Sequence, residues 1–130
     1  MMQSVDNFSS SCTVLVVVDD DGAREALTFL LESEGFSVRA YSNPNDVLGQ
    51  TELPPRSCIV TDYNMPQMNG LELVAELRKR QSSIPAILIT GASNLAIRNR
   101  AAAAYVPVIE KLYVDKLPRF IQEMMGSAIN

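Results

Sequence analysis

Histidine is absent from this chain of 130 residues, and cysteine occurs only twice. Histidine is the usual general base near neutral pH and the commonest ligand of transition metals, so its absence excludes the ordinary forms of both kinds of site. Any chemistry must use carboxylates, lysine, hydroxyls or thiols. Cys58 stands in an apolar run and is expected to be buried. Spacing leaves a disulfide to Cys12 open, but a reducing cytoplasm is the simpler interpretation.

Basic residues are outnumbered, because 11 Lys and Arg face 15 Asp and Glu and give a formal net charge of −4. A general nucleic-acid binder normally carries a basic face, so we expect no direct contact with nucleic acid. No apolar run reaches the roughly 18–20 residues that span a bilayer. The polar residues 1–11 lack the basic and apolar regions of a secretory signal. We therefore expect a cytoplasmic protein without membrane contact.

The length and the 47% share of hydrophobic residues are those of one globular domain. We place this domain at residues 13–126, between a flexible lead-in at residues 1–12 and a tail at residues 127–130. No repeat and no linker to a second domain is evident. With no room for a separate output domain in 130 residues, the output would run through protein contacts, unless the chain is a fragment of a longer protein.

Short β-rich apolar runs alternate with helical patterns along the chain. Strands are expected at residues 13–18, 36–41, 58–61, 84–90 and 106–110. Helices are expected at residues 23–31 (ended by Gly35), in a short form after Asn43, around residues 71–77, at residues 95–104, and after Asp115. Five β-α units predict an α/β fold with a doubly wound, five-stranded parallel sheet and helices on both faces.

The last helix is expected to use Asp115 as its N-cap. Pro118 then falls in the first turn, where its missing N–H costs nothing. An apolar stripe at core spacing indicates packing rather than docking, and it consists of Leu117, Phe120, Ile121 and Met124.

Polar side chains follow four of the predicted strands. Asp19 and Asp20 follow the first, Asp62 the third, Thr90 ends the fourth, and Lys111 follows the fifth. Carboxyl ends of parallel strands meet at one edge of the sheet, which is where such folds bind ligands. Crowded carboxylates repel one another unless a cation lies among them, and hard oxygen ligands favour Mg²⁺, Mn²⁺ or Ca²⁺. Aspartate can also accept a phosphoryl group covalently.

Four segments carry a resemblance to a known family. They are VVVDD at residues 16–20, DYNMPQMNG at residues 62–70, ILITG at residues 87–91 and IEK at residues 109–111. In this order they resemble the receiver domain of bacterial two-component response regulators, over nearly the whole chain. The resemblance implies a flavodoxin-like (βα)5 sandwich with strand order 2-1-3-4-5.

The resemblance also implies roles for individual residues. Asp62 would be the phosphoacceptor, Thr90 would hydrogen-bond the phosphoryl group, and Lys111 would pair with it. The implied ligands of Mg²⁺, or of Mn²⁺ in its place, are Asp20, Asp19 through water, Asp62, and the backbone carbonyl of Asn64. Gly70 would shape the loop at a position that needs an unusual φ.

The implied phosphoryl donor is a phosphohistidine on a histidine kinase or on a histidine phosphotransfer protein. The chain would be a switch in a phosphorelay rather than an enzyme, although it would catalyse its own phosphorylation and also its own dephosphorylation, which would be slow. A downstream protein partner is implied, and homodimerisation through the helix 4–strand 5–helix 5 face is open.

The chain departs from the family pattern near the output end. The family has Lys-Pro with a cis peptide, whereas Leu112 follows Lys111, so a trans bond is expected. The family's switch aromatic corresponds to Val108, and Tyr105 is the nearest aromatic before it. These departures predict intact phosphorylation with an altered readout.

Two alternatives stand beside this reading. The segment DDDGA at residues 19–23 is similar to the nucleophile loop of haloacid-dehalogenase-like phosphatases, with Asp19 as nucleophile and Asp21 as acid/base. That family also needs an acidic pair after strand 4, which residues 90–93 do not offer. The second alternative is a degenerate receiver that acts as an interaction domain without phosphorylation.

Overall fold

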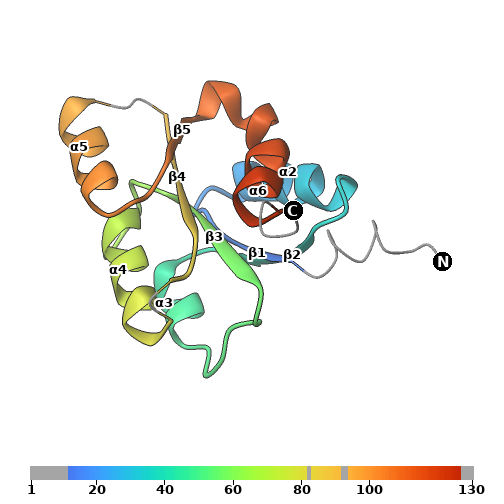
Figure 1. Ribbon diagram of the computed structural model, residues 1–130, viewed down its shortest axis with the longest axis horizontal. Coiled ribbons are helices and arrows are strands. Elements are labelled where there is room, and N and C mark those ends of the chain that lie inside the picture. Colours follow the sequence, from blue (N-terminus) through green and yellow to red (C-terminus); the bar gives the residue numbers. More distant parts are fainter. Residues whose placement is uncertain (1–11, 82, 92–93, 127–130) are drawn as a thin grey trace.

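The computed structural model describes residues 12–81, 83–91 and 94–126. Almost all of the expected lead-in, and the whole of the tail, lie outside these residues. Five parallel strands form one sheet in the order β2-β1-β3-β4-β5 (Figure 1). The strands are β1 (Thr13–Val17), β2 (Ser37–Tyr41), β3 (Ser57–Asp62), β4 (Ala86–Thr90) and β5 (Val108–Glu110). The predicted fold and strand order are confirmed.

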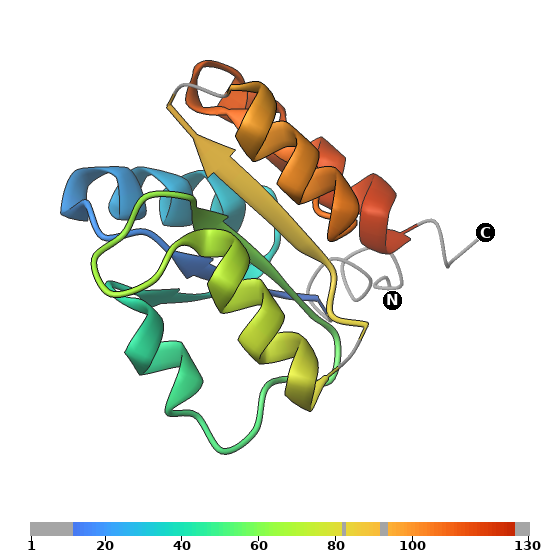
Figure 2. The same ribbon diagram turned by 90° about the vertical axis from the view of Figure 1, so that its left-hand side faces the viewer.

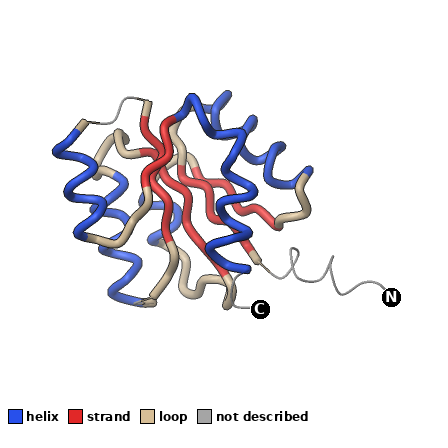
Figure 3. The backbone as a smooth tube through the Cα atoms, turned by 45° about the horizontal axis from the view of Figure 1, so that its top comes forward, coloured by secondary structure: helices blue, strands red, loops and turns tan. Residues whose placement is uncertain are grey.

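Helices cover both faces of this sheet, as parallel strands require. They are α2 (Asp21–Ser33), α3 (Pro44–Leu48), α4 (Gly70–Arg80), α5 (Leu95–Ala103) and α6 (Leu117–Gly126), with a 3₁₀ segment η1 (Lys111–Lys116) between β5 and α6. Figures 1 and 2 show α3, α4 and α5 on one side and α2 and α6 on the other. The strands run between these two layers (Figure 3).

Alternate strand residues divide the core into two clusters. Val14, Val16 and Val60 face α2 and α6, where they pack with Leu31 and Ile121. On the other face, a second cluster joins Leu15, Val17 and Ile59 of the strands to Leu73 of α4 and Ile97 of α5. Burial on both faces explains why the strands are continuously apolar in sequence.

Several boundaries differ from the sequence-based expectation. Strand β5 begins at Val108 rather than at residue 106, because Pro107 has no N–H to donate to a ladder. Asp115 does not cap the last helix, since it lies inside η1, while α6 begins at Leu117. Pro118 still falls in the first turn of α6.

The remaining local predictions agree with the structure. Gly35 ends α2 with a φ of 95°. Leu117 and Ile121 of the α6 stripe are buried, and Phe120 and Met124 pack partly against the same core. Cys12 and Cys58 are both buried and carry free thiols. Among the described residues, no helix has the length and apolar character needed to cross a membrane.

Candidate functional site

Strand register brings the predicted groups to the carboxyl edge of the sheet. Val17 pairs with Thr61, which places Asp19 close to the residue that ends β3. Asp62 pairs with Ile89, so Thr90 lies one residue further on the neighbouring strand. Thr90 in turn pairs with Glu110, the residue before Lys111. Four strands therefore deliver their polar residues to one place, as the sequence predicted.

Asp62 is the buried carboxylate of this edge. It is 4% exposed, and Thr90 beside it is 3% exposed. The Nζ atom of Lys111 lies 3.2 Å from Oδ1 of Asp62. That oxygen makes no hydrogen bond within the described residues, so the contact is an ion pair.

Lys111 reaches Asp62 although leucine follows it. The described residues contain no cis peptide bond, so the Lys111–Leu112 bond is trans, as expected. The chain turns directly from β5 into η1. This turn brings the half-exposed lysine side chain to the carboxylate without the proline of the family pattern.

Electrostatics around Asp62 favour its protonated form. Burial raises the pKa of the Asp62 carboxyl, and the charges of Asp19 and Asp20 raise it further. Lys111 acts against both effects and lowers the pKa. An added cation at this edge would offset the same carboxylate repulsion.

Asp20 caps helix α2, in addition to any role at the site. Its Oδ2 accepts a hydrogen bond of 2.8 Å from the Ala23 N–H, which makes Asp20, rather than Asp21, the N-cap of α2. Asp21 instead pairs with Arg24, whose guanidinium also donates to the Val18 carbonyl at 2.8 Å. The cap fixes Asp20 while leaving its other carboxylate oxygen available.

The donor set fits a magnesium ion. The oxygens expected from the sequence are carboxylates and the backbone carbonyl of the exposed Asn64, and these are the kinds of ligand that Mg²⁺ prefers. In the described part of the chain, no three acidic, cysteine or histidine side chains are already gathered into a metal cage. Mg²⁺ suits such an open site because it binds through one or two carboxylates and keeps several waters.

Gly70 shapes the loop after Asp62 for a different reason from the one expected. The only glycine with a positive φ in the described chain is Gly35, so an unusual φ is not what Gly70 supplies. A Cβ atom there would lie 2.3 Å from the Asp62 carbonyl oxygen and 2.7 Å from Leu88 Cδ1. The positive φ of the loop, 80°, belongs to Gln67. Gly70 is needed because α4 begins in contact with the main chain of Asp62.

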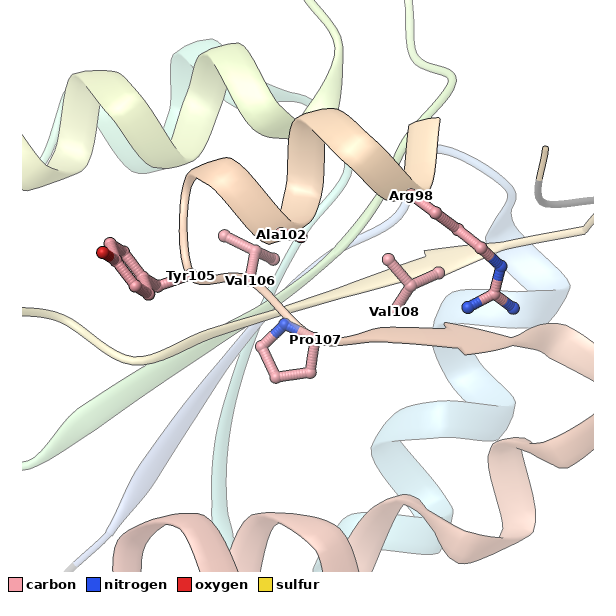
Figure 4. A pocket seen from close by; sticks show the side chains of 6 residues that line it. All are labelled: Arg98, Ala102, Tyr105, Val106, Pro107 and Val108. Atoms are coloured by element: carbon pink, nitrogen blue, oxygen red, sulfur yellow. The ribbon is translucent and has the colours of Figure 1, made fainter. Parts of the chain in front are cut away.

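Of the three candidate switch residues, Thr90 lies beside Asp62, whereas Val108 and Tyr105 lie apart from it. Tyr105 is 87% exposed and has a φ of 57° just after α5, at the opposite end of β5 from Lys111. The Tyr105 and Val106 N–H groups donate to the carbonyls of Ala102 and Ala101, a helix-ending motif that usually has glycine at the Tyr105 position. Figure 4 shows the ring of Tyr105 pointing away from Val108, which lines an open hollow of ≈ 450 Å³ beside α5.

Two features of the site were not predicted from the sequence. A mostly apolar groove of ≈ 370 Å³ runs between α2 and η1 and reaches Asp62 and Lys111; its α2 wall comes from Ala23, Ala26, Leu27 and Leu30. The helical spacing of these residues predicts that they share one face of α2, but it does not predict that a groove separates part of this face from η1. The second feature is a hydrogen bond of 3.3 Å from Arg100 of α5 to the Tyr63 hydroxyl.

Known proteins share this sequence and fold. The family model of the response regulator receiver domain matches residues 14–112. The transcriptional regulatory protein FixJ of Bradyrhizobium diazoefficiens is 32% identical over 117 residues, which are 88% of this chain and 57% of that protein. The chain spans roughly half the length of the curated relatives it matches, between 38% and 57% of the first three.

Solved structures agree with the family match. The crystal structure of FixJ-N is 33% identical, with a TM-score of 0.69 over 76% of this chain and 80% of that one. The response regulator TrrA of Thermotoga maritima, solved in complex with Mg²⁺–BeF, is 27% identical, with a TM-score of 0.73 over 85% of this chain and 96% of that one. Neither the phosphatase nor the interaction-domain alternative gains support. The chain belongs to the response regulator receiver domains, the phosphorylation-based switches of two-component signalling.

Proposed function

We propose that Asp62 is the phosphoacceptor of this receiver domain. The observation that carries the proposal is a buried carboxylate at the carboxyl edge of the sheet, whose Oδ1 makes no hydrogen bond among the described residues and lies 3.2 Å from the Lys111 ammonium. A carboxylate oxygen is the nucleophile that an aspartyl phosphate requires. The ammonium of Lys111 then lies where negative charge gathers on the phosphoryl group.

The transfer uses a phosphohistidine of a histidine kinase or phosphotransfer protein as donor. An oxygen of the Asp62 carboxylate forms a bond to phosphorus while the bond between phosphorus and the donor imidazole nitrogen breaks. The electron pair of that bond stays on the imidazole, which takes up a proton. Lys111 and the Thr90 hydroxyl stabilise the phosphoryl oxygens. The groove between α2 and η1 gives the donor a path to Asp62.

A Mg²⁺ ion, or Mn²⁺ in its place, would be held by Asp20, Asp62 and the Asn64 carbonyl, with Asp19 contacting it through water. When bound, the ion supplies positive charge against the phosphoryl oxygens. Support comes from the oxygen donor set and from the TrrA relative, which was solved with Mg²⁺–BeF. The N-cap bond of Asp20 presents its second oxygen in a fixed direction.

Downstream, the chain acts as a phosphoacceptor switch rather than as an enzyme with its own substrate. Its signal passes to a protein partner in the cytoplasm, without direct contact with nucleic acid by this domain and without a membrane. A homodimer through α5, β5 and α6 is one form of output, because the hollow beside Val108 lies on that face. The switch involves Thr90, and Val108 provides no polar atom to take part.

Phosphorylation is tested by intact mass after incubation with Mg²⁺ and acetyl phosphate. The wild type is expected to gain one phosphoryl group, and Asp62→Asn none. Asp21→Asn is the control, because Asp21 is exposed and pairs with Arg24 rather than with the site. Retained phosphorylation in Asp62→Asn together with its loss in Asp19→Asn would contradict the assignment and restore the phosphatase alternative, in which Asp19 is the nucleophile.

A further inference from the structure

Helix α5 is lightly anchored to the core. Of its nine residues, only Ile97 and Ala101 are buried. Its first residue, Leu95, is 73% exposed. By contrast, α4 buries Gly70, Leu73, Val74 and Leu77 on the same face of the sheet. Polar contacts at the surface therefore contribute a larger share of what holds α5 in place.

Two arginines of α5 reach residues that flank the Asp62–Lys111 ion pair. Arg100 donates at 3.3 Å to the hydroxyl of Tyr63, the residue directly after Asp62. Arg98 pairs at 3.2 Å with Glu110, the residue directly before Lys111. Figure 4 shows the Arg98 side chain extending from α5 alongside β5. Helix α5 thus contacts the sequence neighbours of both members of the ion pair, Tyr63 next to Asp62 and Glu110 next to Lys111.

The main chain of Tyr63 leaves little freedom on the α4 side. Its N–H donates to the Ile89 carbonyl at 3.0 Å, and its carbonyl accepts from the Gly70 N–H at 2.9 Å. Gly70 is packed so closely on the Asp62 carbonyl that a Cβ atom would overlap it. These contacts oppose a shift of the Asp62–Tyr63 peptide toward α4. The Tyr63 side chain, by contrast, is hydrogen-bonded to Arg100 of α5.

We infer that the Tyr63–Arg100 and Glu110–Arg98 contacts are tethers that position α5 according to the state of Asp62. The inference rests on the proposed phosphorylation of Asp62. A phosphoryl group adds about −1.5 to −2 charges, and it draws the Lys111 ammonium away from the carboxylate oxygen it now contacts. The residues bonded to Asp62 and Lys111 move with them and loosen or redirect the tethers. Tyr63 and Glu110 are positioning residues, since they act on α5 and do not touch the phosphoryl group.

The variants are chosen to remove each tether without disturbing the core. Tyr63→Phe deletes only the hydroxyl, and Glu110→Gln keeps the side-chain shape but removes its charge. Arg100→Gln removes the first tether from the exposed side and serves as the second variant if Tyr63→Phe packs poorly. Tyr41→Phe is the matched control, because Tyr41 lies on β2, away from α5 in the sheet order.

Hydrogen exchange of the α5 amides, followed by mass spectrometry without any phosphoryl mimic, tests the resting tethers. Tyr63→Phe and Glu110→Gln are each expected to speed exchange in α5 by about two- to tenfold, the effect of losing one net polar contact. Tyr41→Phe is expected to exchange at the wild-type rate there. Wild-type exchange rates in α5 for both tether variants would overturn the inference.

A second measurement compares the same amides before and after Mg²⁺ and beryllofluoride. The wild type is expected to change its α5 exchange, and the Tyr63→Phe/Glu110→Gln double variant to lose most of that change while still gaining a phosphoryl mass from acetyl phosphate. An undiminished α5 response in the double variant would overturn the inference. Absence of a phosphoryl gain in the wild type would instead refute the proposed function, and the resting-state exchange would still decide whether the tethers exist.

Discussion

At the residue scale, Asp62 joins two properties that oppose each other. Its carboxylate is 4% exposed, which disfavours charge, yet the proposed chemistry needs the charged form. Lys111 offsets part of the cost, but burial is the larger effect and the pKa of Asp62 stays raised. The charged form of Asp62 is therefore unfavourable in the resting site, and a bound cation would stabilise it.

This conflict predicts how stability depends on pH in metal-free buffer. Because the pKa of Asp62 is higher in the folded state than in the unfolded state, folding is favoured below the unfolded pKa, and this advantage is lost as pH rises through the folded pKa. Asp62→Asn removes the charge at nearly constant shape. We expect the variant to be more stable than the wild type at pH 7, with the difference shrinking toward acid.

Urea unfolding followed by circular dichroism, from pH 4 to pH 8 with EDTA present, measures that difference. Asp115→Asn, at an exposed position on η1, controls for the change of residue type. A wild type more stable than Asp62→Asn at pH 7 would show that Lys111 outweighs burial.

Gly70 provides a second prediction at this scale. An alanine Cβ would approach the Asp62 carbonyl oxygen to 2.3 Å, so Gly70→Ala must shift α4 or β3. We expect a loss of about 1–3 kcal/mol in the free energy of unfolding, as for other overpacked sites. Gly22→Ala is the control, since its Cβ would meet only Asp20 Oδ2 at an ordinary 3.5 Å. Chemical denaturation of both variants checks the contrast, and equal stability of Gly70→Ala and the wild type would contradict it.

The sequence predicted which polar groups lie at the strand ends, but it did not predict the structural roles of all the residues around them. Asp62, Thr90 and Lys111 could be predicted because carboxyl ends of parallel strands share an edge. The role of Gly70 was misjudged, because a close contact between segments is a tertiary fact, whereas φ is a local one. Tyr63 gave no signal for the same reason, since its partner Arg100 is 37 positions along the chain.

At the element scale, helix starts follow local sequence rules closely. Asn69 accepts from the Glu72 N–H at 2.8 Å, and the Glu72 carboxylate accepts from the Asn69 N–H at 2.9 Å, which forms a capping box. The side chains of Asn43 and Asn94 cap α3 and α5 by accepting from the N–H groups of Asp46 and Ile97.

Sequence reasoning placed two boundaries wrongly. The start of β5 at Val108 follows from Pro107, a local effect that the apolar pattern did not reveal. Asp115 lies inside η1, and a change from strand to 3₁₀ helix has no strong local signature.

The capping box predicts a measurable cost at the start of α4. Asn69→Ala removes the acceptor for the Glu72 N–H and is expected to lower the free energy of unfolding by about 1 kcal/mol. Glu72→Ala should cost less, and the double variant less than the sum, because the two bonds belong to one motif. Thermal unfolding of the three variants provides the test. Additive losses would mean that the two bonds act independently.

At the scale of the whole molecule, the core and the site are separable. Both apolar clusters lie between the sheet and its helices, while Asp19 and Asp20 are exposed at the edge. The hydrophobic pattern therefore sufficed to predict a doubly wound α/β fold without any knowledge of the site, whereas the strand order came from the family resemblance. Which surface passes the signal onward could not be predicted in that way, because α5 carries little apolar pattern of its own.

This separation predicts different responses to metal. EDTA is expected to abolish phosphorylation by acetyl phosphate while leaving the circular dichroism spectrum unchanged. Added Mg²⁺ should stabilise the folded chain, by about 2.7 kcal/mol at a hundredfold excess over its Kd. Double replacement of Asp19 and Asp20 by Asn should remove the Mg²⁺-dependent rise in Tm. A Tm that rises equally in that variant would place the ion elsewhere.

The two outer strands of the sheet have a consequence for how copies of the protein meet in a crowded solution. Strand β5 spans only Val108–Glu110, follows a proline and turns at once into η1. Strand β2 carries the exposed charge of Arg39 at its centre. Short, charged or proline-bordered edges resist the addition of a further strand. The outer strands of this sheet therefore do not offer a ready template on which another copy of the chain could add a strand.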